Sequence, residues 1–268
     1  MSGTWAWPLI ETLAAWRATR PGLFRWVHQR VADLEPDGFR YMNWGFAGPE
    51  LPRPELVDDP ERTCVHLYHH VASQGAVGGA DVLDLGCGRG GGAGYVRRVL
   101  GPRRVVGVDS VSASIQLARQ RFVGEAGLEF VCAPMARVPF QHQSFDVVLS
   151  IDSTHGVADM DAFFQEARRL LRPKGELLLA DLREDWGPDE ARMIGHGFEM
   201  IEVEDLTLGV LHALELDAPR RKRLARTQPW PLRGAAAVLL GVPGTPLHTG
   251  LKKGWLQHMR YRLRRVER

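Results

Sequence analysis

From residue 81 onward, continuous apolar runs alternate with segments of helical periodicity. The apolar runs are DVLDL (81–85), RRVVGVD (103–109), LEFVC (128–132), FDVVLSI (145–151) and GELLLADL (175–182). Runs of this kind are typical of parallel strands that are buried on both faces of a sheet. Between them, apolar residues recur at helical spacing in 111–122 and in 160–171, which predicts helices there. The alternation predicts a Rossmann-like α/β fold with an open parallel sheet.

The N-terminal part of the chain has a different pattern. Apolar residues recur at helical spacing in 9–16 and in 23–31, and Pro21 separates the two sets. This predicts two short amphipathic helices, whose aromatic faces either pack over the main domain or contact a lipid surface. We therefore expect a helical lid over residues 1–60 and an α/β domain over residues 61–268, with substrate-binding elements in the C-terminal segment of that domain.

The composition is that of an ordinary soluble protein. Of the 268 residues, 44% are hydrophobic and 25% are charged, and the formal net charge is +2. A balance so close to neutral does not indicate a nucleic-acid partner. Basic residues gather in 220–223 and in the tail 252–268. The interpretation we favour is that they solvate helix faces, and the alternative is that they meet an anionic partner.

The spacing of cysteines and histidines argues against disulfides and metal sites. Cys64, Cys87 and Cys132 are odd in number and form no CxxC pair. Several histidines lack ligand-like spacing from acidic or cysteine residues. These are His69, His70, His142, His248 and His258. We therefore expect a metal-independent protein. No window approaches the ~18 apolar residues of a membrane span, and no signal-peptide pattern is present, so we expect a cytoplasmic location.

A glycine-rich turn follows the first apolar run. Its sequence is DLGCGRGGG, from Asp84 to Gly92. Glycines let the backbone turn sharply from strand to helix and let a ligand approach main-chain atoms closely. Because Gly86, Gly88 and Gly91 also fit the pattern GxGxxG, the turn alone does not exclude a nicotinamide-dependent oxidoreductase.

Two carboxylates bear on the choice of cofactor. Asp109 ends the second run, where a carboxylate accepts hydrogen bonds from both hydroxyls of an adenosine ribose. A nicotinamide dinucleotide contains that ribose, and so does a cofactor that joins adenosine to a methionine moiety. Asp84, inside the first run, suits a cofactor with a cationic ammonium, whereas it would repel the oxygens of a pyrophosphate. The amino group of a methionine moiety is such a cation.

Four segments resemble, in order, the successive motifs of class I S-adenosylmethionine-dependent methyltransferases. They are VLDLGCGRGGG, VVGVDSVSASI, VPFQHQSFDVVLSIDSTHG and FFQEARRLLRPKGELLLADLR. Outside this core, FRYMNWGF (39–46) and GVPGTPLHTGLKKGWLQHMRYRLRR (241–265) are similar to segments of actinobacterial enzymes that methylate phthiotriol-type lipids and related polyketides. The resemblance implies a class I methyltransferase fold and S-adenosylmethionine as the cofactor.

The resemblance also implies roles for residues at matching positions. Asp84 would face the amino group of the methionine moiety, and Asp109 would hold the ribose. Tyr41 and Asn43 would close over the cofactor from the N-terminal side. The other cofactor contacts that we predict are Gly86, Cys87, Gly88, Gly90, Ser110, Met135 and Ile151.

Two positions depart from the family pattern. The stretch from Cys132 to Met135 has no acidic residue beside the adenine, which leaves Met135 to pack on the ring. The tripeptide Pro-Lys-Gly at 173–175 replaces the usual Pro-Gly-Gly in what we predict to be a turn.

The predicted chemistry is an in-line displacement, for which the protein chiefly aligns the reactants and excludes water. A hydroxyl acceptor must also lose a proton. His155, after the fourth run, lies where related small-molecule methyltransferases often place a histidine, and neutral imidazole suits a general base. Asp181, at the end of the fifth run, would orient this imidazole or bind the acceptor. Asp152 is the second candidate base.

We expect the acceptor to be a small hydrophobic molecule such as a lipid or polyketide, because the flanking segments are rich in tryptophan. These tryptophans are Trp5, Trp7, Trp16, Trp26, Trp44, Trp230 and Trp255. We favour methylation of oxygen. The alternatives are methylation of carbon or nitrogen, and a cofactor-binding relative that catalyses a cyclisation or serves as a non-catalytic partner. The pattern predicts neither the acceptor's identity nor the oligomeric state.

Overall fold

The computed structural model describes residues 39–48, 58–157, 159–183 and 188–267. The two amphipathic helices that we predict near the N-terminus lie outside these ranges. Within the described residues, no helix is both long enough and apolar enough to cross a membrane.

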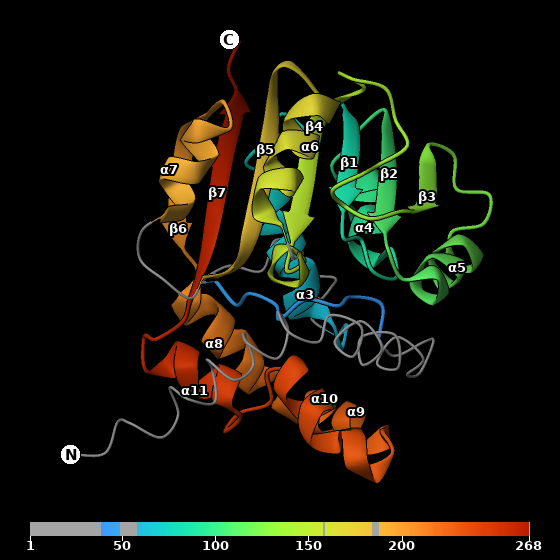
Figure 1. The fold of residues 1–268 in the computed structure, drawn as a ribbon. Coiled ribbons are helices and arrows are strands. Elements are labelled where there is room, and N and C mark those ends of the chain that lie inside the picture. Colours follow the sequence, from blue (N-terminus) through green and yellow to red (C-terminus); the bar gives the residue numbers. More distant parts are fainter. Residues whose placement is uncertain (1–38, 49–57, 158, 184–187, 268) are drawn as a thin grey trace.

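A seven-stranded sheet with the order β3-β2-β1-β4-β5-β7-β6 forms the centre of the molecule (Figure 1). Its strands are β1 (Asp81–Leu85), β2 (Arg104–Asp109), β3 (Leu128–Cys132), β4 (Phe145–Ile151), β5 (Leu171–Arg183), β6 (Phe198–Asp205) and β7 (Gln257–Arg265). Every predicted apolar run forms a strand, and β1 to β5 pair in parallel, so the Rossmann-like α/β class is confirmed. The apolar runs do not predict β6 and β7, and β7 pairs antiparallel with both β5 and β6.

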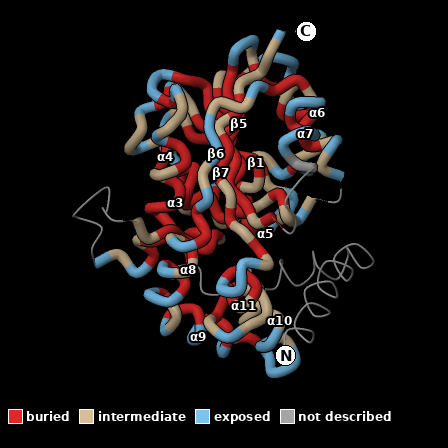
Figure 2. The backbone as a smooth tube through the Cα atoms, turned by 90° about the vertical axis from the view of Figure 1, so that its left-hand side faces the viewer, coloured by how far each residue is buried: buried red, intermediate tan, exposed pale blue. Residues whose placement is uncertain are grey.

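Helices cover both faces of the sheet (Figures 1 and 2). The helical elements are α3 (Arg62–Ala72), α4 (Gly91–Val99), α5 (Ser112–Arg121), η2 (Thr154–Gly156), α6 (Met160–Leu170), α7 (Pro188–Gly195), α8 (Thr207–Leu216), α9 (Ala218–Thr227), η3 (Trp230–Leu232), α10 (Arg233–Leu239) and α11 (Pro246–Lys252). Side chains of a strand alternate between the two faces. Val82 accordingly packs with α3 and α4, and Leu83 packs with α6 and α7. The sheet is therefore the shared wall of two apolar cores.

The predicted turn at 173–175 lies within β5, so this detail of the prediction is wrong. The register of β5 against β4 shifts here, because Phe145 pairs with Leu171 whereas Val147 pairs with Glu176. Lys174 takes up the extra length with a φ of 63°. The sequence signal for a turn thus marks an irregularity inside a long strand.

The basic residues of the C-terminal tail lie mainly in β7 and pair with acidic residues of the neighbouring strands. Arg260 donates to Glu204 at 2.7 Å on β6, and Arg262 donates to Glu176 at 2.8 Å on β5. Our interpretation of this tail as a solvated helix face is therefore wrong. The alternating arginines help to hold β7 between its two neighbours.

The segment 39–48 lies between the sheet and the C-terminal helices (Figure 1). The N–H of Phe46 donates to the carbonyl of Thr63 on α3, and the N–H of Ala47 donates to the carbonyl of Gly209 on α8. Phe39 forms a small apolar cluster with residues of α9 and α10. The segment is thus held by α3, which follows it in the sequence, and by helices of the C-terminal part of the chain.

Buried arginines tie α9 to this segment. Arg221 is 2% exposed and bonds to the carboxylate of Asp217 at 2.9 Å. Its guanidinium also donates to the carbonyls of Asn43, Trp44 and Leu240. Arg220 is buried as well, and only the other half of the basic run at 220–223 is exposed, so our solvated-face interpretation fails for half of that run.

We expect Arg221→Ala to lower the free energy of unfolding by about 3–5 kcal/mol, because it leaves buried carbonyls and Asp217 without this donor. Arg223→Ala, at an exposed position on the same helix, is the matched control and should change it by only about 0.5 kcal/mol. Urea unfolding of both variants measures the difference. Equal losses in the two variants would show that the buried arginine is not a structural clamp.

Candidate active site

The glycine-rich turn joins β1 to α4 at the carboxyl end of the sheet. Gly90 caps α4 with a φ of 78°, in the left-handed region that favours glycine. Gly92 permits a close approach, because a Cβ at this position would lie 1.8 Å from Cζ of Tyr68. The turn therefore lets the Tyr68 ring reach Asp84 across the first turn of α4.

Asp84 is a buried carboxylate that is short of partners. Its Oδ2 accepts a hydrogen bond from the Tyr68 hydroxyl at 3.2 Å, and its Oδ1 has no hydrogen-bond partner among the described residues. Burial raises the pKa of Asp84 to about 7, the Tyr68 hydrogen bond opposes this rise, and the nearby Asp109 adds to it. An ammonium group would supply the missing charge partner, so this position fits the methionine moiety of the expected cofactor.

Asp109 ties the glycine turn to the start of α5. Its Oδ2 accepts the N–H of Gly88 at 3.0 Å, and its Oδ1 accepts the N–H of Val111 at 2.8 Å. Burial raises the pKa of Asp109, while these backbone hydrogen bonds lower it. Ser110 is exposed beside it. A carboxylate has further lone pairs, so two ribose hydroxyls fit this position as well.

Two methionines flank the glycines of the turn. The Sδ atom of Met135 lies 3.1 Å from where a Cβ on Gly86 would be, and the Sδ atom of Met42 lies 3.1 Å from where a Cβ on Gly88 would be. Met135 is therefore beside the turn, as its predicted contact with adenine requires. The sequence reasoning missed Met42, which lies within the FRYMNWGF segment.

Tyr41 and Asn43 are buried in the same segment. The Tyr41 ring centroid lies 6.2 Å from that of Tyr68, the residue that donates to Asp84. The amide of Asn43 donates to the carbonyl of Cys64 at 3.1 Å and accepts the N–H of Gly45 at 2.9 Å. Asn43 thus braces its own segment against α3, and its predicted contact with the cofactor stays a prediction.

Cys87 and Ile151 have their side chains in the apolar core beside α3. The Sγ atom of Cys87 lies 2.9 Å from where a Cβ on Gly107 would be, so it points toward β2. Burial raises the pKa of this thiol well above its usual range. A contact of Cys87 with a cofactor would therefore come from its main chain.

His155 and Asp181 form a hydrogen-bonded pair after β4 and within β5. Nδ1 of His155 lies 2.8 Å from Oδ1 of Asp181, and the hydroxyl of Thr154 donates to Oδ2 at 2.6 Å. The N–H groups of His155 and Leu182 also donate to this carboxylate. Burial alone would raise the pKa of Asp181, but the His155 charge and these hydrogen bonds hold it well below its usual range. Asp181 therefore stays ionised.

A second histidine and aspartate pair lies beside the first. Nε2 of His258 on β7 is 2.6 Å from Oδ1 of Asp152, and Oδ2 of Asp152 accepts the N–H of Trp44 at 2.7 Å. Asp152 adopts a φ of 50°, a backbone conformation that is uncommon outside glycine and is often found at functional sites. The sequence reasoning missed His258, because β7 brings it to a partner 106 positions away.

Trp44 connects the two pairs. Its ring stacks on that of His155 with centroids 5.5 Å apart and lies edge-on to that of His258 at 6.2 Å. Its Nε1–H donates to the carbonyl of Leu239 on α10. Among the predicted pocket tryptophans, Trp44 therefore lies at the site, whereas Trp230 is 80% exposed and does not line a buried pocket.

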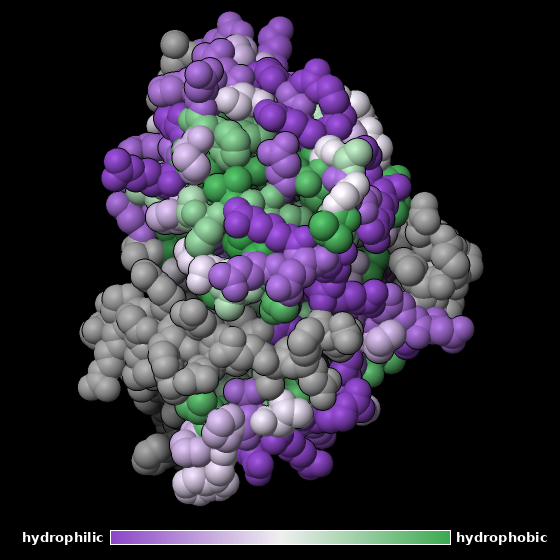
Figure 3. All heavy atoms as spheres, turned by 90° about the vertical axis from the view of Figure 1, so that its right-hand side faces the viewer, coloured by the Kyte–Doolittle hydropathy of each residue, from purple (hydrophilic) through white to green (hydrophobic). Residues whose placement is uncertain are grey.

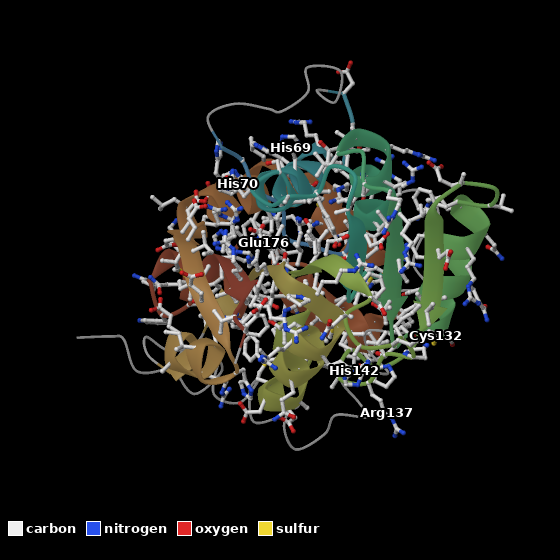
Figure 4. All side chains as sticks on the ribbon, turned by 90° about the horizontal axis from the view of Figure 1, so that it is seen from above. His69, His70, Cys132, Arg137, His142 and Glu176 are labelled. Atoms are coloured by element: carbon white, nitrogen blue, oxygen red, sulfur yellow. The ribbon has the colours of Figure 1, made fainter. Side chains whose placement is uncertain are left out.

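No group of three or more metal-ligating side chains is found among the described residues. Seen from above the sheet, His69 and His70 lie on one side and His142 on the other (Figure 4). The cysteines are likewise unpaired, with Cys64 and Cys87 buried and Cys132 exposed.

The chain is similar to known methyltransferases. Residues 83–179 match the family model described as a methyltransferase domain. A probable phthiotriol/phenolphthiotriol dimycocerosates methyltransferase 2 from Mycobacterium ulcerans is 34% identical, over 82% of this chain and 87% of that protein. A fatty-acid O-methyltransferase from Mycolicibacterium smegmatis is also 34% identical, over 73% of this chain and 72% of that protein.

The fold is shared with solved structures as well. The crystal structure of the cyclase SpnF covers 90% of this chain and 94% of its own, with a TM-score of 0.70 and 17% identity. At this identity the likeness concerns the fold alone. The relatives at 34% identity carry the assignment to a family: this chain belongs to the S-adenosylmethionine-dependent methyltransferases, in the family of the phthiotriol/phenolphthiotriol dimycocerosates methyltransferases.

Proposed function

We propose that this chain methylates an oxygen atom of a hydrophobic small molecule and that His155 is the general base. The observation that carries the proposal is the 2.8 Å contact between Nδ1 of His155 and the carboxylate of Asp181. A carboxylate in this place favours the tautomer in which Nδ1 carries the proton and Nε2 accepts one. Because Asp181 is buried and ionised, it also stabilises the imidazolium that forms.

The reaction we propose needs little more than alignment and one proton transfer. S-adenosylmethionine, when bound, supplies an electrophilic methyl carbon on a positively charged sulfur. Transfer of the methyl group to the acceptor oxygen would leave the cofactor as its neutral thioether, and Nε2 of His155 would accept the hydroxyl proton. Trp44, stacked on the imidazole, keeps the ring in place and excludes water.

We propose a lipid or polyketide as the acceptor. One relative at 34% identity is named for phthiotriol dimycocerosates and another for fatty acids, and the second is an O-methyltransferase by name. Transfer to oxygen is also what a histidine with a carboxylate partner supports, because a hydroxyl acceptor must lose a proton. The buried Trp44 beside His155 gives an apolar acceptor a surface to pack against.

For the cofactor, we propose that Asp84 pairs with the amino group and Asp109 with the ribose. The main chain of the turn, at Gly86, Cys87, Gly88 and Gly90, would line the methionine moiety. Met135, beside Gly86, would pack on the adenine, which compensates for the missing acidic residue after β3. The predicted contacts of Ser110, Ile151, Tyr41 and Asn43 are part of the same proposal.

We also propose that residues 1–60 act as a lid over the methyltransferase domain at 61–268. The described part of the lid, residues 39–48, supports this, because it lies against both the glycine turn and the pair formed by His155 and Asp181. Methylation of carbon or nitrogen is the second candidate. A cyclisation is not favoured, since the relatives at 34% identity are methyltransferases.

We predict that the affinity for S-adenosylhomocysteine increases as the pH rises through about 7, the pKa of Asp84. Below this pH, free Asp84 holds a proton and cannot pair with the ammonium, whereas the ligand's amino group is protonated throughout the neutral range. Tyr68→Phe removes a hydrogen bond that lowers the pKa of Asp84, so the rising limb should move to higher pH. Calorimetry across pH measures both profiles.

Asp84→Asn should weaken binding on the order of tenfold to a hundredfold and remove the rising limb. The matched ligand control is methylthioadenosine, which lacks the amino acid moiety and should bind to Asp84→Asn and to the wild type equally well. A wild-type affinity that stays flat across neutral pH would exclude Asp84 as the partner of the amino group.

We predict that His155→Ala lowers turnover of a long-chain alcohol by about a hundredfold to ten-thousandfold, while the affinity for S-adenosylhomocysteine is unchanged. The wild-type rate should fall at acid pH, because the imidazolium accepts no proton, and the variant should lose this dependence. Transfer of a labelled methyl group measures the rates. Asp181→Asn should also slow the reaction, since an amide no longer enforces the tautomer.

Two controls separate base catalysis from loss of structure. His196 also contacts an aspartate, Asp161 at 2.9 Å, but this pair lies outside the site. His196→Ala should therefore leave turnover unchanged. A long-chain fatty acid, whose carboxylate needs no base, should be methylated by His155→Ala at a rate close to that of the wild type. If His155→Ala keeps the wild-type pH profile with the alcohol and His258→Gln loses it, the base belongs to the second pair.

A further inference from the structure

The end of the molecule formed by α9, η3 and α10 carries exposed basic residues around an exposed tryptophan. These residues are Lys222, Arg223, Arg226, Trp230 and Arg233, and we call them the basic tip. In Figure 1, α9 and α10 lie at the opposite end from the C-terminus, and Figure 3 shows strongly hydrophilic side chains at this end. The segment 218–256 contains no aspartate or glutamate. The basic tip therefore has no acidic residue of its own segment to neutralise it.

The two acidic residues that directly precede this segment face other groups. Asp217 is buried and bonds to Arg220 and Arg221 inside the protein. The side chain of Glu215 points toward His248, at 3.9 Å. The charges of the basic tip thus add up to a local positive surface on a chain whose net charge is only +2.

Trp230 is held outward by a rigid turn. It is 80% exposed and stands between Pro229 and Pro231 in η3. The N–H of Leu232 donates to the carbonyl of Pro229, and Nε of Arg233 donates to the carbonyl of Gln228. A large aromatic side chain in water forgoes the free energy that its burial would give, so a fixed, outward tryptophan indicates a partner that covers it.

We propose that the basic tip docks this protein on the surface of an anionic lipid bilayer. Lysine and arginine side chains are attracted to anionic headgroups, and a tryptophan ring prefers the boundary between headgroups and acyl chains. A nucleic acid or an acidic protein would also attract the charges. The exposed tryptophan in their midst favours the bilayer, because an interfacial aromatic residue adds apolar burial to the electrostatic attraction.

Docking in this orientation brings the active site close to the bilayer. The carbonyl of Leu239 on α10 accepts the Nε1–H of Trp44, and Trp44 stacks on His155. The helix α10, whose sequence is RGAAAVL, thus runs from Arg233 in the basic tip to Leu239, which contacts Trp44 beside the catalytic pair. This step rests on the proposed function: a lipid acceptor would pass from the membrane along α10 to Trp44. The docking itself does not depend on it.

The test is flotation of the full chain with vesicles of equal parts phosphatidylglycerol and phosphatidylcholine, compared with vesicles of phosphatidylcholine alone. The wild type should float with the anionic vesicles, and added salt should release it. The double variant Lys222→Gln, Arg226→Gln should lose about fivefold in partitioning for each charge removed. Trp230→Ser should lose on the order of tenfold in partitioning.

Matched controls lie at the amino ends of the strands, away from the basic tip. Lys174→Asn removes one exposed charge at a φ of 63° that asparagine tolerates, and Val123→Ser alters an apolar side chain that is 84% exposed. Both should float as the wild type does. S-adenosylhomocysteine binding by calorimetry should be unchanged in every variant, which verifies folding and keeps this test separate from the proposed catalysis.

Several outcomes would overturn the proposal. It fails if the wild type stays unbound with anionic vesicles, or if the variants of the basic tip float as well as the controls do. Binding to a single-stranded RNA or to an acidic protein at a salt concentration where no vesicle binding occurs would assign the surface to another polyanion, and the bilayer proposal would then be wrong.

Discussion

Three buried carboxylates at the carboxyl ends of the central strands govern how this site is built. Asp84 and Asp181 are fully buried, and Asp152 is 8% exposed. A buried charge costs several kcal/mol unless it is paired and hydrogen-bonded, so each carboxylate needs donors from outside its own strand. The donors come from α3, from the segment 39–48, from η2 and from β7. Much of the fold around the site serves this requirement.

The requirement also explains why segments far apart in the chain meet here. Trp44 reaches Asp152 through its backbone N–H and is fixed from behind by Leu239 and by the buried guanidinium of Arg221. His258 reaches the same aspartate because β7 enters the sheet antiparallel beside β5. The position of the Trp44 ring against His155 thus depends on contacts with α9, α10 and β7 at once, and a change in any of them would move the stacked imidazole.

The sequence predicts the parallel strands β1 to β5 better than it predicts the C-terminal part of the structure. β1 to β5 are recognisable because they are continuously apolar. The pairing of His155 with Asp181 could be anticipated because both lie toward the carboxyl ends of neighbouring strands. The strand β7 could not, since its alternate arginines resemble a solvated surface until their glutamate partners on β5 and β6 are known. Burial of Arg221 could not be predicted either, because a run of four basic residues is usually exposed. The role of His258 was missed because its partner is distant in sequence.

Asp181 and Asp84 differ in the number of hydrogen-bond donors around them, and this difference suits them to different roles. Asp181 receives hydrogen bonds from Thr154, from two backbone N–H groups and from His155, so it keeps its charge and its place. Asp84 receives one, and its pKa rises to about 7 as a result of burial. A protein built for stability alone would gain from a neutral side chain here. Asp84, at the start of the glycine-rich turn, is instead suited to a cationic ligand that completes its pairing. The free energy that this carboxylate does not contribute to folding then contributes to binding.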